Sequence, residues 1–164
     1  MIIISHRGNI TGRLSSKGQE NTCEAIENAI ALGYHVEIDI FKRGEKITLG
    51  HDIPQEEFSV AAFIAKFYNV RDKLWIHCKN IDALIFCADV LKDDFIYFGH
   101  SLDEFVLTSN KCIFTCPNKL KGKNVICVMP ELIDNFQMSD NYYGILTDYP
   151  EIYEKNYFTF RSQR

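Results

Sequence analysis

The chain has 164 residues, a length that fits one domain with a single hydrophobic core. Its 18 lysines and arginines against 22 aspartates and glutamates give a formal net charge of -4, and the basic residues are scattered. This balance argues against nonspecific nucleic-acid binding. No apolar run approaches the ~18 residues that span a bilayer, so we expect no stable membrane insertion.

The cysteines indicate a reducing environment. The chain has six of them without a CxxC pair, and most lie in apolar stretches, where a free thiol behaves as a small hydrophobic side chain. The N-terminal residues MIIISHRG lack the charged start and long apolar run of a signal peptide. We therefore expect a cytoplasmic location, while the sequence leaves the oligomeric state open.

Eight short apolar runs predict β-strands, and several are apolar almost throughout, as is typical of parallel strands covered on both faces. They are residues 2–5, 36–40, 47–50, 74–78, 95–99, 112–116, 125–129 and 144–148. Helical patterns occupy 20–33, 55–69 and 80–92, and a further short helix is expected to start at Pro130. We expect the tail, residues 158–164, to be a loosely held end.

The alternation of strands and helices predicts βα units around a parallel sheet. Eight strands predict a closed (β/α)8 barrel of the TIM type, as a single domain over residues 1–164. Such a barrel commonly uses about 250 residues, so the helices after the fifth strand must be reduced to loops. An open doubly wound sheet is the alternative.

Polar side chains gather where the predicted strands end. Four of the five histidines follow or end a strand, and the exception is His35. The set at these ends is His6, Arg7, Glu37, Asp39, His51, Asp52, His77, Lys79, His100 and Asp148. Parallel barrel strands share one rim at their C-terminal ends, where barrel active sites lie, so we expect these side chains to converge.

Two acidic residues of this set predict a metal site. Glu37 and Asp39 alternate with Ile38 and Ile40, which places both carboxylates on one side of the strand, about 6.5–7 Å apart along it. Two inward carboxylates repel each other unless a cation lies between them, and oxygen ligands favour Mg²⁺ or Ca²⁺. The alternative is that Arg7 and Lys79 pair with them.

Two histidines predict proton transfer. His6 and His51 each lie beside a glycine after a predicted strand, and a pair of imidazoles can act as general acid and general base at neutral pH. A hard cation with basic side chains nearby suits an anion whose charge grows in the transition state. A small-molecule phosphodiester is the substrate class that fits best.

The ordered motifs resemble those of the glycerophosphodiester phosphodiesterase family, within the superfamily of phospholipase C-like phosphodiesterases. They are HRG at 6–8, ENT at 20–22, EID at 37–39, HD at 51–52 and LTDYP at 146–150. The resemblance implies an acid/base pair in His6 and His51 and metal ligands in Glu37 and Asp39. It further implies phosphate contacts from Arg7 and Lys79, and an acidic position near the site at Glu20.

The chain departs from the family pattern at two places. The family has an acidic third metal ligand two residues before the lysine, and His77 takes that place here. An imidazole in the metal shell shifts the preference toward Mn, Fe or Zn. Only 21 residues separate Asp52 from Leu74, so the small inserted subdomain of many family members is absent, and a glycerol-sized alcohol would be poorly enclosed.

Three functions remain open on this basis. The first is a metal-dependent phosphodiester hydrolase. The second is a barrel that binds phosphate or another anion through His6, Arg7 and Lys79 without turnover. The third is a phosphodiester lyase whose product is a cyclic phosphate.

Overall fold

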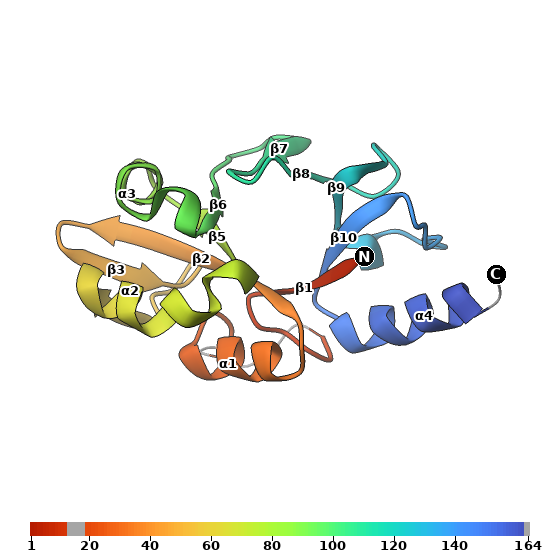
Figure 1. The fold of residues 1–164 in the computed structure, drawn as a ribbon, viewed down its shortest axis with the longest axis horizontal. Helices are drawn as coiled ribbons and strands as arrows, with labels where there is room; N and C mark the ends of the chain where they lie inside the picture. Colours follow the sequence, from red (N-terminus) through yellow and green to blue (C-terminus); the bar gives the residue numbers. More distant parts are fainter. Residues whose placement is uncertain (13–18, 163–164) are drawn as a thin grey trace.

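The protein has a mixed α/β fold built on one curled β-sheet (Figure 1). A computed structural model describes residues 1–12 and 19–162. Across the parallel part of the sheet, these residues form β6 (Ile96–Phe98), β5 (Leu74–Cys78), β2 (His35–Arg43), β1 (Ile2–His6), β10 (Tyr142–Thr147), β9 (Gly122–Val128) and β8 (Ile113–Thr115), in that order. Three further strands are antiparallel: β3 (Lys46–Leu49) pairs with β2, β4 (Glu56–Ser59) with β3, and β7 (Phe105–Leu107) with β8.

The first strand of the chain pairs with the last, as in a barrel. β1 lies between β2 and β10, and the parallel strands follow chain order in one direction around the sheet. Because crossovers between parallel strands are right-handed, this order keeps the connecting helices on one face. A doubly wound sheet would need helices on both faces, so that alternative does not describe the fold.

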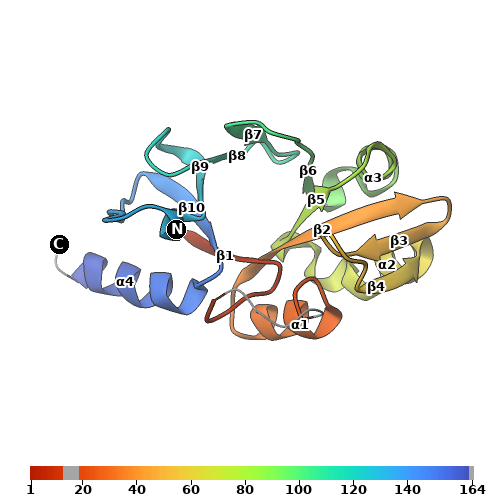
Figure 2. The ribbon, with the colours of Figure 1, turned by 180° about the vertical axis from the view of Figure 1, so that it is seen from behind.

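Four α-helices are present among the described residues: α1 (Cys23–Ala31), α2 (Val60–Phe67), α3 (Ile81–Phe86) and α4 (Pro150–Ser162). Figure 2, the view from behind, shows them outside the curled sheet. Each of the first three starts at a side-chain cap, where Thr22, Ser59 or Asn80 accepts a hydrogen bond from the backbone N–H three residues on. Asn80 also bonds the backbone N–H and C=O of Lys42, which ties the start of α3 to β2.

The sheet curls without closing into a continuous ladder. β7 folds back along β8, and within residues 1–12 and 19–162 no strand pairing joins β6 to β7 or β8. Ser109 spans this joint: its N–H donates to Tyr97 O at 2.9 Å, and its Oγ accepts from Tyr97 N–H at 3.0 Å. The expectation of a closed (β/α)8 barrel is therefore wrong, although the α/β class, the barrel-like strand order and the reduced helices of the C-terminal half hold.

The shortage of helices follows from the length of the connections. A helical crossover between parallel strands needs a dozen or more residues, and only residues 116–121 join β8 to β9. From β6 to β10 the one helical connection in the described chain is a 3₁₀ turn at Pro130–Leu132. The short chain predicted that the helices after the fifth strand would be reduced to loops, and the C-terminal half has this character.

Buried apolar side chains form two main layers, one on each face of the sheet. Ile38 and Ile40 of β2 belong to the cluster on the outer face, together with Ile26 of α1. A second cluster fills the inside of the curl and contains Trp75, Phe98, Phe114 and Leu146 together with Ile4. Strand side chains alternate between faces, so Glu37 and Asp39, the neighbours of these two isoleucines, point into the curl.

Four elements differ from the sequence-based expectation, and one of them, β7, lies where no element was expected. Residues 47–50 were expected to be a parallel barrel strand, but β3 is antiparallel to β2. The helix expected at 55–69 begins as strand β4, because these residues pair with β3, where Phe58 lies opposite Ile47. The described part of the expected loose tail, residues 158–162, continues helix α4. No described helix is long and apolar enough to cross a membrane.

Candidate active site

Strand register brings the acidic and basic side chains of β1, β2 and β5 abreast. His6 is the partner of Glu37 across β1 and β2, and Asp39 is the partner of His77 across β2 and β5. Directly opposed residues on neighbouring strands share a face, so all these side chains point into the curl. The rim predicted from strand ends is therefore present for these three strands.

His51 reaches the same rim by a different route. β2 continues beyond the residues that pair with β1 and β5. The chain then turns and returns as β3, so that Leu49 lies opposite Ile40. The N–H of Gly50 then donates to Asp39 O at 3.1 Å. This returning hairpin, and not a parallel strand, sets His51 at the level of Asp39.

A pocket of about 330 Å³ opens at this rim. Its charged and titratable lining from the N-terminal half consists of His6, Arg7, Glu37, His51, His77 and Lys79. Two predicted site residues lie behind this lining. Asp39 has no exposed surface and contacts the lining residues, and Glu20 lies 3.1 Å from Arg7 through its Oε2.

Each of the two histidines proposed for proton transfer has a carboxylate on Nδ1. His6 Nδ1 lies 2.8 Å from Asp148 Oδ1, and His51 Nδ1 lies 2.7 Å from Asp52 Oδ1. An ionised carboxylate can only accept, so Nδ1 carries a proton in both rings and Nε2 is the atom left for exchange with a ligand. Burial alone would lower the pKa of His6, but the Asp148 hydrogen bond and the charge of Glu37 outweigh it and raise the pKa.

The acidic residues of β2 form a possible metal site with His77. Ligand atoms of Glu37, Asp39 and His77 all lie within 4.8 Å of one another, and all three residues are buried. Glu37 Oε2 and His77 Nε2 are buried without a hydrogen-bond partner in the described chain. Such unpaired buried atoms are costly, and a divalent cation between the carboxylates would satisfy Glu37 Oε2. His77 faces these carboxylates through Nδ1, which lies 2.9 Å from Asp39 Oδ1 and 3.6 Å from Glu37 Oε1. The donor set of two carboxylates and one imidazole fits Mn, Fe or Zn as well as Mg²⁺.

The same carboxylates also have cationic protein partners. Asp39 Oδ2 lies 2.9 Å from Arg7 Nε, and Asp39 Oδ1 lies 2.9 Å from His77 Nδ1 and 3.8 Å from Lys79 Nζ. Burial by itself would raise the pKa of Asp39, but His77 and Arg7 hold it well below its usual range. Burial would likewise lower the pKa of His77, yet Asp39 and Glu37 raise it to about 9. The alternative that Arg7 and Lys79 pair with the two carboxylates is thus present for Asp39, whereas Glu37 faces His6 and His77.

Three residues of the site were assigned no role from sequence. Asn21 donates to Asp39 Oδ2 at 3.1 Å and accepts from Asp39 N–H at 2.9 Å. Asp148 orients His6, and its sequence signals are its position at the end of the last predicted strand and its place in the LTDYP motif. His100 lines the pocket, and its ring stacks on that of His77 with centroids 4.7 Å apart.

No family model matches the chain, and neither a curated protein nor a solved structure matches it. What the fold and the site define is an α/β protein with a curled sheet and a histidine-rich, charged pocket at the C-terminal ends of its first strands. Any assignment of activity therefore depends on the residues of this pocket.

Proposed function

We propose that the protein is a metal-dependent phosphodiester hydrolase related to the glycerophosphodiester phosphodiesterases, with a shortened form of their barrel. The observation that carries the proposal is that His6 and His51 line one pocket, each with a carboxylate on Nδ1. Carboxylates on both rings fix the tautomers and leave both Nε2 atoms for proton exchange, as a two-histidine mechanism requires.

The pocket residues divide the work of the reaction. Arg7 and Lys79 bind the phosphate anion, and Glu20 holds Arg7 by its ion pair. One histidine removes a proton from the attacking water. The phosphorus–oxygen bond to the alcohol then breaks, and the other histidine protonates that oxygen, which gives an alcohol and a phosphomonoester.

Glu37, Asp39 and His77 are the residues that would hold the metal ion. A bound divalent cation would balance the negative charge that grows on the phosphoryl oxygens. Lyase chemistry differs only in the nucleophile, because attack by a neighbouring substrate hydroxyl gives a cyclic phosphate. Phosphorus NMR of the product distinguishes this outcome from hydrolysis.

The test starts with elemental analysis of the purified protein, followed by a panel of aryl phosphodiesters with that metal supplied. His6→Ala and His51→Ala should each lower turnover roughly 10²- to 10⁴-fold, and EDTA should abolish it. His35→Ala is the matched control, because His35 is the one histidine outside the pocket lining. Retained activity in both pocket variants, with folding checked by circular dichroism, would refute the proposal.

A second candidate function is a phosphate-binding protein without turnover. It is favoured by the ion pairs of Asp39 with Arg7 and His77 and by the contact of His77 with Glu37, which supply positive charge to the acidic pair without a metal. Calorimetric titration with Mg²⁺, Ca²⁺, Mn²⁺ and Zn²⁺ separates the two functions. Binding of inorganic phosphate without binding of any of these cations would support the second candidate.

A further inference from the structure

The pocket has two chemically different halves. The half from β1, β2, β5 and the segment after β3 carries His6, His51 and His77 together with Arg7, Glu37 and Lys79. The half from the later strands is lined by Phe98 on β6, Val106 on β7, Phe114 on β8, Val128 on β9 and Leu146 on β10. The proposed phosphate chemistry uses only the first half.

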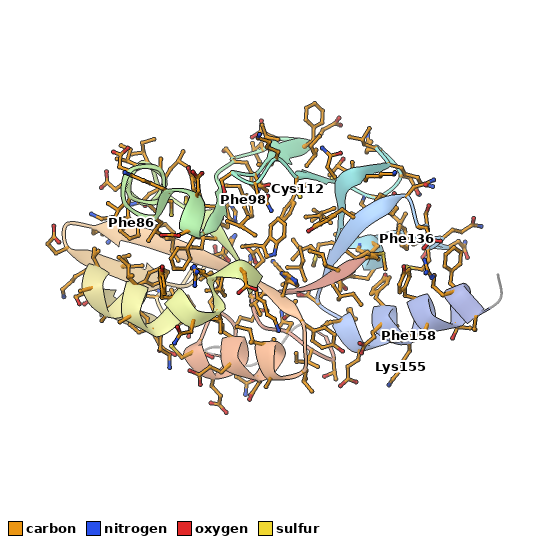
Figure 3. All side chains as sticks on the ribbon, in the orientation of Figure 1. Phe86, Phe98, Cys112, Phe136, Lys155 and Phe158 are labelled. Atoms are coloured by element: carbon orange, nitrogen blue, oxygen red, sulfur yellow. The ribbon has the colours of Figure 1, made fainter. Side chains whose placement is uncertain are left out.

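The apolar half is a preformed surface. Phe98, Phe114 and Leu146 are each 4% exposed, and they belong to the cluster that fills the inside of the curl. The rings of Phe98 and Phe114 have centroids 4.8 Å apart, and Phe114 lies 5.6 Å from Trp75. Figure 3 shows Phe98 among the side chains that occupy the space inside the sheet. Packing on several sides holds these rings in place.

The polar residues of this half lie at its edge. His100, Ser101, Asp103, Glu104 and Cys116 line the pocket but are exposed. Two of them are already engaged, since Asp103 Oδ2 accepts from Ser101 N–H at 3.4 Å and Glu104 lies 3.4 Å from Lys119. The buried Thr115 hydroxyl is directed to Glu104 O at 3.5 Å. A ligand group that enters this half therefore contacts apolar side chains on the pocket wall and water-exposed polar groups at the edge.

We propose, resting on the phosphodiesterase function above, that this half binds the alcohol group of the substrate and that this group is an aryl or alkyl group without hydroxyls. A polyol such as glycerol would leave water without finding buried partners for its hydroxyls, which costs free energy. An aryl or alkyl group gains from leaving water and contacts packed rings. The substrate class is thus a phosphodiester with an apolar alcohol.

Calorimetry with two phosphomonoesters tests the subsite without turnover. The full chain is titrated at about pH 8, where phenyl phosphate and glycerol 3-phosphate are both dianions. The pocket should bind phenyl phosphate roughly 10- to 200-fold more tightly. Equal affinities, or no binding of either compound, would overturn the inference.

A pair of variants on one strand locates the effect. Val106 lines the pocket, whereas Leu107, the next residue of β7, points outward and is 68% exposed. Val106→Asn should reduce the preference for phenyl phosphate roughly tenfold, and Leu107→Asn should leave it unchanged. An equal loss in both variants would show that the preference does not arise in this half.

The results separate this inference from the proposed function. Hydrolysis of phosphodiesters together with equal affinity for the two monoesters would refute the apolar subsite and leave the hydrolase standing. A strong, Val106-dependent preference for phenyl phosphate without hydrolysis of any diester would refute the hydrolase and leave the apolar subsite standing.

Discussion

Asp39 carries a negative charge at a position with no exposed surface, so its neighbours must stabilise that charge. Arg7 and His77 supply positive charge, and Asn21 supplies a hydrogen bond to the carboxylate and an acceptor for the Asp39 N–H. Asn21 does so from a left-handed backbone conformation with φ of 54°. Asparagine tolerates that conformation better than most residues, which accounts for its use here.

Asn21→Ala should therefore lower the free energy of unfolding by about 2–4 kcal/mol, because a buried N–H loses its acceptor and alanine is strained at positive φ. Asn21→Gly removes the same hydrogen bonds without the strain and should cost about 1 kcal/mol less. Urea denaturation of both variants measures the difference. A loss below about 0.5 kcal/mol in Asn21→Ala would place Asn21 among ordinary surface positions and contradict this account.

The strand-end residues of β1, β2 and β5 could be predicted from sequence because the two-residue period of a strand is a local property. His6, Glu37 and His77 lie where that reasoning expects them. The Asp148 partner of His6 is 142 residues away along the chain, and no local pattern encodes such a pairing. The sequence therefore predicts which residues face the pocket better than it predicts which residues hold them.

The elements themselves show the same limit. The strand at 47–50 was predicted, but its direction was wrong, because pairing with β2 decides it. A signal was present: only Gly44 and Glu45 separate β2 from β3, too few residues for a parallel crossover. Helix α4 was missed because its fit to the fold comes from tertiary contacts, such as the Tyr34 hydroxyl donating to Glu154 at 2.9 Å.

The approach of α1 to the loop after β1 depends on Gly8. Its φ is 84°, and a Cβ at this position would lie 2.7 Å from Ala25 Cβ and 2.8 Å from Ala25 C. Gly33, at the other end of α1, has φ of 97° with nothing within 4 Å of an added Cβ. The two glycines therefore separate backbone strain from crowding between elements.

Gly33→Ala should cost about 1–2 kcal/mol of stability from positive φ alone. Gly8→Ala should cost about 2–5 kcal/mol, because α1 must also move away from the loop that carries Arg7. Thermal and urea unfolding of the two variants give the comparison. Equal losses would mean that the loop and α1 adjust freely, and that Gly8 does not set their distance.

The free energy of local opening should differ between two parts of the molecule. Helices cover the part of the sheet around β1, β2 and β5, where the largest buried cluster lies. The part from β6 to β8 has β7 as an antiparallel strand, and Phe105 and Leu107 are 66% and 68% exposed. Ser109 bonds span the joint between β6 and β7. We infer that β7 and β8 open without unfolding of the helical part.

Native-state hydrogen exchange tests this unevenness with two variants. In the unmodified protein, amides of β7 and β8 should show a lower opening free energy than those of β2 and β5. Ser109→Ala should lower both values by about 1 kcal/mol, because it removes the bonds of the hydroxyl to Tyr97 N–H and Phe95 O, which break in both openings. Phe63→Leu, in the cluster under the helices, should lower only the β2 and β5 values by about 1–2 kcal/mol, because that cluster stays intact when β7 opens. If Phe63→Leu lowered the values for β7 and β8 equally, the sheet would open as one unit, and the joint at Ser109 would not divide it.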